Sequence, residues 1–203
     1  MRIVHIETIL NCGKYARSPH WIETRHAIHK AVRRCAWPPG TKKFTIYPER
    51  EANGVVPIRA EFIKELRKLE WTIEGKAKNL LGDALGDFDA ILPWTDGPVV
   101  VEWETGNISS SHRSMNKLTM LVSDGIIAAG VLVIPSRKLY FYLTDRIGNY
   151  QELAPYVKLW KSVPCKSGVL EIVVIEQDAE SLKVPKIPKG TDGWARFQRS
   201  MKS

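Results

Sequence analysis

The sequence predicts an α/β protein with a central mixed β-sheet flanked by helices. Short apolar runs of strand length alternate with segments whose apolar residues recur at helical spacing. One pair of runs is joined by a turn signal, which favours antiparallel pairing, and another pair is joined by a helical segment, which favours parallel pairing. With 203 residues, of which 44% are hydrophobic, the chain is expected to form one domain over residues 1–203.

The N-terminal half is expected to supply a first strand and two helices. Residues 1–10 have the composition of a strand, and residues 20–37 carry apolar side chains on one helical face until Pro38-Pro39-Gly40 ends the pattern. A second helix is expected over residues 56–69, with a proline close to its start. Residues 74–86 are ambiguous and are interpreted as a linker.

The C-terminal half is expected to complete the sheet. Asp96-Gly97-Pro98 is a turn signal between residues 88–92 and 99–104, which predicts an antiparallel hairpin. A helix over residues 112–123 leads to an apolar strand over residues 130–134, and this order predicts a right-handed parallel crossover. A mostly helical segment and a last strand follow, at residues 136–160 and 168–175.

Two glutamates, Glu102 and Glu104, end the apolar run Val99-Val100-Val101. Because residues two apart on a strand point to the same face, their carboxylates are expected to lie side by side, about 6 to 7 Å apart. Asp89 lies thirteen residues before Glu102, a spacing suited to pairing across the hairpin. Like charges at the edge of a core need a cation between them, and Mg²⁺ binds carboxylate oxygens well. The pattern therefore predicts a metal centre.

Two alternatives stay open for these residues. Glu102 and Glu104 could belong to a solvent-facing edge strand, although the valines before them favour burial on both faces. Asp89 could be a strand-start residue in a turn, with Asp87 as its nearest rival as a ligand. Asp89 is favoured because it enters the apolar run Ala90-Ile91-Leu92.

The composition adds a polyanionic partner and a cellular setting. A formal net charge of +8 suits such a partner, whereas a basic surface that serves only solubility is at least as common. A carboxylate site in a basic protein indicates phosphate held near a divalent ion. Three cysteines without CxxC spacing favour a reducing, cytoplasmic setting. No apolar run approaches the roughly 20 residues of a membrane span, so no membrane association is expected.

A polar and basic segment after the hairpin is the expected DNA-facing surface. Asparagine and serine there can bond base edges or phosphates, although serines that only cap a helix are an equal alternative. A second basic pair follows the strand that ends at Pro135, where a loop could enter the major groove. The expected DNA-binding residues are Asn107, Ser109, Ser110, Arg113, Lys117, Arg137 and Lys138.

With these parts in order, the chain resembles the PD-(D/E)xK nuclease fold, in the variant whose third catalytic position is not lysine. It is similar to the BglII and BstYI group of type II restriction endonucleases, to which BamHI is related. The similarity covers residues 1 to about 160 and rests on the order of short motifs. These are MRIVHIETILN at the start, Ile46-Tyr47-Pro48, Phe62-Ile63-Lys64-Glu65-Leu66, Glu102-Trp103-Glu104-Thr105-Gly106-Asn107 and Leu139-Tyr140-Phe141-Tyr142.

The resemblance implies a role for each acidic residue. Asp89 and Glu102, with the carbonyl of Trp103, are expected to bind Mg²⁺, for which Mn²⁺ can substitute. Glu104 takes the position that faces the attacking water, where it is expected to accept a proton or hold a second ion. Glu74 is a weaker candidate for a fourth carboxylate.

The resemblance also implies a homodimer that embraces palindromic double-stranded DNA, and several members of the group recognise sites with a GATC core. The first interpretation is therefore a Mg²⁺-dependent type II restriction endonuclease. The alternatives are a repair or recombination nuclease that reads DNA structure, and a DNA-binding protein without activity. A glycosidase is disfavoured, because neighbouring carboxylates on one strand are not arranged across a sugar ring.

Overall fold

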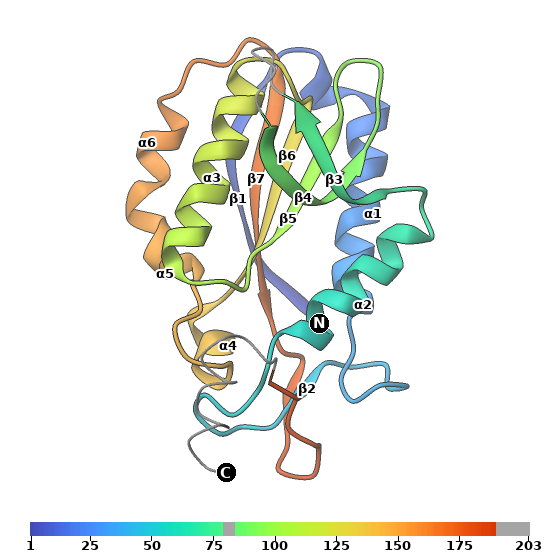
Figure 1. Ribbon diagram of the computed structural model, residues 1–203, viewed down its shortest axis with the longest axis vertical. Helices are drawn as coiled ribbons and strands as arrows, with labels where there is room; N and C mark the ends of the chain where they lie inside the picture. The colour runs from blue at the N-terminus through green and yellow to red at the C-terminus, as the bar shows by residue number, and fades with distance from the viewer. Residues whose placement is uncertain (79–83, 190–203) are drawn as a thin grey trace.

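The computed structural model describes residues 1–78 and 84–189, and within them a six-stranded mixed sheet lies between layers of helices (Figure 1). Its strands are β1 (Arg2–Cys12), β3 (Thr72–Lys78), β4 (Ala84–Leu92), β5 (Val99–Trp103), β6 (Ala129–Pro135) and β7 (Gly168–Glu176). They stand in the order β1-β7-β6-β5-β4-β3. β5, β6 and β7 are parallel, whereas β1 and the β3–β4 pair are antiparallel to their neighbours. The predicted α/β class with a mixed sheet is confirmed.

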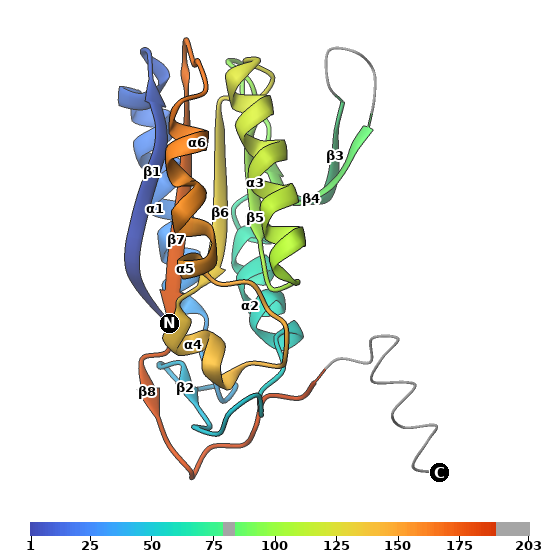
Figure 2. The ribbon, with the colours of Figure 1, turned by 90° about the vertical axis from the view of Figure 1, so that its left-hand side faces the viewer.

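Helices cover both faces of this sheet (Figure 2). α1 (Pro19–Arg34) and α2 (Val56–Arg67) pack on one face, and α3 (Ile108–Ser123), α5 (Tyr150–Leu153) and α6 (Val157–Lys161) pack on the other. α4 (Arg137–Tyr142) lies at the end of the sheet near a small parallel pair, β2 (Thr45–Ile46) and β8 (Ala179–Glu180). Among the described residues, the helices are all too short or too polar to cross a membrane.

The central strands explain why the sequence contains continuous apolar runs. Every residue of β5 and β6 is buried. Val99 and Val101 face α1 and α2, while Val100 between them faces α3. A strand that is covered on both faces needs apolar side chains in both directions, so its pattern is a run and not an alternation. The crossover from β5 through α3 to β6 is parallel, as predicted.

The predicted hairpin of β4 and β5 is confirmed, with Ala90 opposite Val101 and Leu92 opposite Val99. The interpretation of residues 74–86 as a linker is wrong, because residues 72–78 form β3 and pair with β4, which begins at Ala84. Residues 79–83 of that segment lie outside the described residues. In the part of the chain that the structure describes, β3 is an edge strand beside β4, so it lacks the apolar pattern of a buried strand. Figure 2 shows this pair extending away from the body of the sheet.

Two predicted helix boundaries are also wrong. α1 ends at Arg34 instead of Trp37, and the approaching Pro38 disfavours helical backbone in the residue before it. α3 begins at Ile108 instead of His112, because the side chain of Asn107 accepts a hydrogen bond from the backbone N–H of Ser110 at 3.0 Å. The serines after Asn107 therefore lie in the first turn of α3.

Gly168, at the start of β7, gives a test of the packing between β7 and α3. Its φ is +142°, and a Cβ atom there would lie 2.8 Å from Cγ1 of Val122. We expect Gly168→Ala to lower the free energy of unfolding by about 2 kcal/mol, measured by urea denaturation. Gly125→Ala is the matched control, since Gly125 has φ +70° with nothing within 4 Å of the added atom. Equal losses in the two variants would show that the contact with Val122 does not constrain β7.

Candidate active site

The β4–β5 hairpin brings Asp89 and Glu102 together. Since Ala90 pairs with Val101, the next positions along the two strands are Asp89 and Glu102. The backbone N–H of Asp89 donates to Oε2 of Glu102 at 3.3 Å, and the backbone N–H of Trp103 donates to Oδ2 of Asp89 at 2.6 Å. Asp87, the rival ligand, has an exposed side chain. The register of the hairpin therefore joins Asp89 to Glu102 and leaves Asp87 outside this contact.

Glu102 and Glu104 are both buried, each 8% exposed. β5 lies between β4 and β6 inside the sheet, so the alternative of a solvent-facing edge strand is wrong. Burial of two carboxylates is unfavourable unless each is paired or hydrogen-bonded. The surroundings of each group therefore matter for its chemistry.

Two basic side chains neutralise Asp89 and Glu102. Nε of Arg59, from α2, donates to Oδ1 of Asp89 at 3.0 Å, and its Nη2 contacts the same oxygen. Nζ of Lys117, from α3, lies 2.6 Å from Oε1 of Glu102 and 3.8 Å from the ring centroid of Phe88. Two carboxylates and two cations thus balance in charge at the end of the hairpin.

Glu104 is held differently, by the loop that follows β5. Its Oε1 accepts a hydrogen bond from the backbone N–H of Gly106 at 2.7 Å, and its Oε2 accepts one from Oγ of Ser114 at 3.1 Å. A Cβ atom at position 106 would lie 2.8 Å from Oε1 of Glu104, so glycine allows this close approach. Among the described residues, Glu104 is therefore oriented by neutral donors and not by an ion pair.

Burial raises the pKa of both glutamates. Desolvation is the largest cause for Glu102, where the ion pair with Lys117 opposes it. Desolvation is again the largest cause for Glu104, opposed by the hydrogen bonds from Gly106 and Ser114. The negative charge of Asp89 raises the pKa of each glutamate further. The site therefore favours extra positive charge, whether a proton or a cation.

The carboxylates of Asp89 and Glu102 have the donor chemistry that a divalent ion requires. Among the described residues, no three His, Cys, Asp or Glu side chains are gathered closely enough to hold a metal, and Glu104 is instead hydrogen-bonded to Gly106 and Ser114. Asp89 and Glu102 nevertheless supply adjacent oxygen donors, and both already attract cations of the protein. Hard oxygen donors that require positive charge match Mg²⁺ and similar ions.

The predicted DNA-binding residues of the first segment lie around the N-terminus of α3. Asn107 caps the helix, and Asn107, Ser109 and Arg113 are exposed, whereas Ser110 is half-buried. Lys117 differs from them, because only 14% of its side chain is exposed and it is paired with Glu102. The structure thus places Asn107, Ser109 and Arg113 at the surface, Ser110 partly at the surface, and Lys117 within the carboxylate site.

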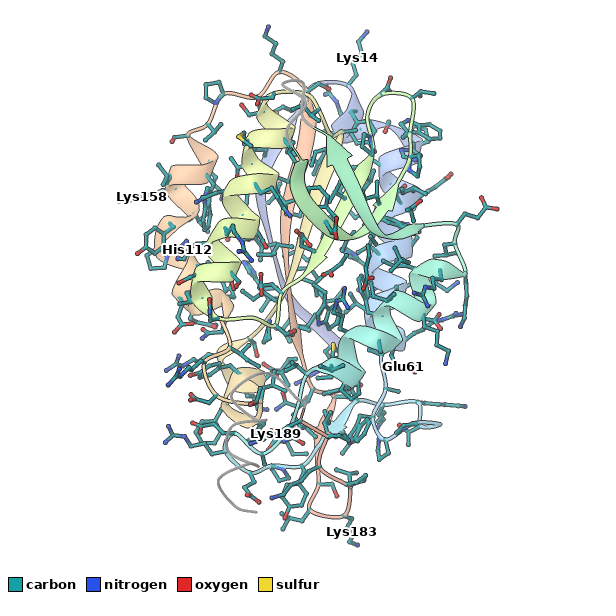
Figure 3. All side chains as sticks on the ribbon, in the orientation of Figure 1. Lys14, Glu61, His112, Lys158, Lys183 and Lys189 are labelled. Atoms are coloured by element: carbon teal, nitrogen blue, oxygen red, sulfur yellow. The ribbon has the colours of Figure 1, made fainter. Side chains whose placement is uncertain are left out.

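His112, on the same helix, packs its ring 4.5 Å from that of Tyr156 and points toward α6 (Figure 3). It contacts none of the three carboxylates among the described interactions. This histidine has a packing role on the helical layer.

The second predicted DNA-binding pair has a different backbone from the one expected. Arg137 and Lys138 do not belong to a loop but form the first turn of α4, whose N-cap Ser136 accepts from the backbone N–H of Leu139 at 3.1 Å. Both side chains are exposed, and Nζ of Lys138 lies 3.2 Å from Glu180. Arg137 and Lys138 come shortly after β6, and Glu104 comes directly after β5. The backbone N–H of Glu104 donates to the carbonyl of Val133 on β6, so these residues lie at the same end of the sheet.

Glu74 and Arg59 lie at the edge of the carboxylate site. The Glu74 side chain is 69% exposed, and its Oε1 is 3.7 Å from Nη2 of Arg59. Glu74 therefore approaches the site through Arg59. Sequence reasoning missed Arg59, although it has helical spacing to the apolar residues Phe62 and Ile63, which indicates the buried face of α2.

Comparison with known proteins identifies the family. The family model described as restriction endonuclease BamHI matches residues 1–194. Type II restriction enzyme OkrAI of Oceanobacter kriegii is 40% identical over 195 residues, which cover 96% of this chain and 99% of that enzyme. Type II restriction enzyme BamHI of Bacillus amyloliquefaciens is 35% identical over 182 residues, which cover 82% of this chain and 78% of that enzyme.

The fold also resembles that of a solved restriction endonuclease, BglII complexed with a DNA 16-mer. The TM-score is 0.60 at 13% sequence identity, and the match covers 88% of this chain and 79% of BglII. The resemblance drawn from the sequence motifs is confirmed. The findings favour a restriction endonuclease over the alternatives of a repair nuclease, an inactive DNA-binding protein and a glycosidase. The chain belongs to the BamHI family of type II restriction endonucleases, which cleave DNA at specific sequences.

Proposed function

We propose that this endonuclease acts as a homodimer of single-domain protomers on a short palindromic site in double-stranded DNA, with Mg²⁺ held by Asp89, Glu102 and the carbonyl of Trp103. The proposed metal centre is supported by the contact between Asp89 and Glu102 across the β4–β5 hairpin. Family membership implies use of a divalent metal. When bound, Mg²⁺ polarises the scissile phosphate, and Mn²⁺ is expected to substitute because it also prefers oxygen ligands.

In this proposal Glu104 accepts the proton of the attacking water. Its raised pKa makes its carboxylate a better proton acceptor than an ordinary glutamate. The hydrogen bonds from Gly106 and Ser114 hold the side chain in one orientation, and burial keeps bulk water away from it. A base that is both oriented and desolvated suits proton transfer during hydrolysis.

We assign DNA binding to the two exposed basic and polar surfaces near this end of the sheet. The N-terminus of α3 presents backbone N–H groups and the positive end of the helix dipole, both of which favour phosphate. Asn107, Ser109, Ser110 and Arg113 surround it. Arg137 and Lys138 form the second surface, and an arginine in the major groove can contact guanine through two hydrogen bonds.

A palindromic site is expected because a two-fold dimer presents the same surface to each half-site. A GATC core is the expected recognition element, by the likeness to the BglII and BstYI group. Digestion of plasmid DNA with Mg²⁺, followed by mapping of the ends, tests this. Discrete fragments with a GATC-centred site support the proposal, whereas fragments that share another core contradict the assignment of the site.

Glu102→Ala is expected to abolish plasmid cleavage at low millimolar Mg²⁺ while DNA binding, measured by gel retardation, is retained. The reason is that Glu102 is assigned to the ion and not to the DNA. Glu61→Ala is the matched control, because Glu61 lies on the outer surface of α2 (Figure 3). Full cleavage by Glu102→Ala would contradict the proposed metal centre.

The pKa shifts predict how activity depends on pH. A protonated carboxyl neither binds an ion nor accepts a proton, and burial raises the pKa of Glu102 and Glu104. As pH is lowered, the cleavage rate is therefore expected to fall at a pH above the ordinary pKa of a glutamate. The measurement is the single-turnover rate as a function of pH. A rate that stays constant down to the ordinary pKa of glutamate would rule out these roles.

Glu104→Gln separates activity from stability. The pKa of Glu104 is higher in the folded than in the unfolded state. The protonated Glu104 side chain therefore adds stability below its unfolded-state pKa, and this stability is lost as pH rises through its folded-state pKa. At pH 7 we therefore expect Glu104→Gln to raise the free energy of unfolding while lowering the cleavage rate about 100- to 10,000-fold. Glu61→Gln should change neither quantity appreciably. Reduced stability of Glu104→Gln at pH 7 would contradict this account.

A further inference from the structure

The two carboxylates assigned to the metal ion are each bound by a basic side chain of the same protein. Arg59 reaches Asp89 from α2 on one face of the sheet, and Lys117 reaches Glu102 from α3 on the other. Both basic residues contact the carboxylate oxygens directly, Oδ1 of Asp89 and Oε1 of Glu102. An ion held by Asp89 and Glu102 would therefore compete with Arg59 and Lys117 for these two carboxylates.

The Lys117 contact is well fixed. Its side chain is 14% exposed, its Nζ lies 2.6 Å from Glu102, and the ring of Phe88 lies beneath it at 3.8 Å. The same Nζ is 3.4 Å from the carbonyl oxygen of Asp87. An ion pair with little exposure is weakly screened by solvent, so it is stronger than a pair at the surface. Lys117 is thus an effective competitor for the Glu102 carboxylate.

The Arg59 contact has an alternative partner close by. Nη2 of Arg59 lies 3.7 Å from Oε1 of Glu74, whose side chain is 69% exposed. A guanidinium displaced from Asp89 can therefore remain paired with Glu74. This gives Glu74 a use in the site other than that of a fourth metal ligand.

We propose that Arg59 and Lys117 act as internal counter-ions that compete with the divalent ion for Asp89 and Glu102, so that the DNA-free protein binds the ion weakly. The proposal rests on the proposed metal centre. A DNA phosphate at the site offers a new anion to the displaced ammonium group of Lys117, and a second anion beside Glu74 to the displaced guanidinium of Arg59. DNA binding and ion binding should therefore strengthen each other. Arg59 and Lys117 are thus positioning residues that couple metal loading to the presence of DNA.

The experiment measures ion binding without cleavage. The probe is Tb³⁺, a hard ion that binds carboxylate oxygens and emits when a nearby tryptophan is excited. Trp103 lies beside the site, since its backbone N–H donates to Asp89. We expect Lys117→Met to bind Tb³⁺ about tenfold more tightly than the unsubstituted protein in the absence of DNA. Arg59→Gln should change the affinity in the same direction, and it provides an independent test if one variant does not fold.

Two controls separate competition from a general effect of charge. Lys158→Met removes the same charge from the outer surface of α6 and should leave Tb³⁺ affinity unchanged (Figure 3). Lys117→Arg keeps the charge and should bind Tb³⁺ about as weakly as the unsubstituted protein. Equal affinities of Lys117→Met and the unsubstituted protein, or an equal gain in Lys158→Met, would overturn the proposal.

A double variant distinguishes failure of this proposal from failure of the metal centre. Adding Glu102→Ala to Lys117→Met should remove the gain in Tb³⁺ affinity, because Glu102 is the oxygen donor that Lys117 releases. A gain that persists in the double variant places the ion elsewhere and contradicts both proposals. If Glu102→Ala loses cleavage but Lys117→Met shows no gain in Tb³⁺ affinity, the proposed metal centre is retained and only the proposed competition is overturned.

The coupling to DNA has its own readout. Tb³⁺ affinity of the unsubstituted protein is expected to rise when a duplex that the enzyme cuts is present, and the rise should be smaller in Lys117→Met. An equal rise in both proteins would contradict a role of Lys117 in the coupling.

Discussion

The antiparallel pairing of β4 with β5 is the constraint on which the carboxylate site depends. With Ala90 opposite Val101, Asp89 and Glu102 are adjacent, and a shift of one residue would turn one of them to the other face of the sheet. The register is held by apolar residues on both faces, because Val99 and Val101 pack toward α1 and α2 while Val100 packs toward α3. Apolar packing in the core therefore fixes the positions of Asp89 and Glu102, although the apolar core cannot itself stabilise their charges.

The second constraint is electrostatic. Carboxylates at the end of buried strands lose hydration and, to a smaller extent, feel the negative charge of Asp89, and both effects raise the pKa of Glu102 and Glu104. The protein responds in two ways. Asp89 and Glu102 receive cations from helices on opposite faces, whereas Glu104 receives neutral hydrogen bonds from Gly106 and Ser114. The acids at this end of the sheet thus have two environments, an ion-paired one at Asp89 and Glu102 and a neutral, hydrogen-bonded one at Glu104.

Several elements could be predicted from the sequence because their patterns have a direct physical cause. β5 and β6 are covered on both faces, so they appear as continuous apolar runs, and the crossover between them follows from the intervening helix. β3 could not be predicted, because an edge strand needs no such run. Arg59 was missed because an arginine on a helix usually faces solvent, and only the position of β4 beneath α2 gives it a half-buried partner, Asp89.

The sequence by itself determined the α/β class and the family and proposed the three acidic site residues, since these depend on local periodicity and on short motifs. Only the tertiary structure decided which cations accompany the carboxylates and which way Glu104 is held. The contact between Arg59 and Asp89 joins residues 30 positions apart, and that between Lys117 and Glu102 joins two elements on either side of a loop. Periodicity records which face of an element is buried, whereas partners across elements are set by how those faces pack.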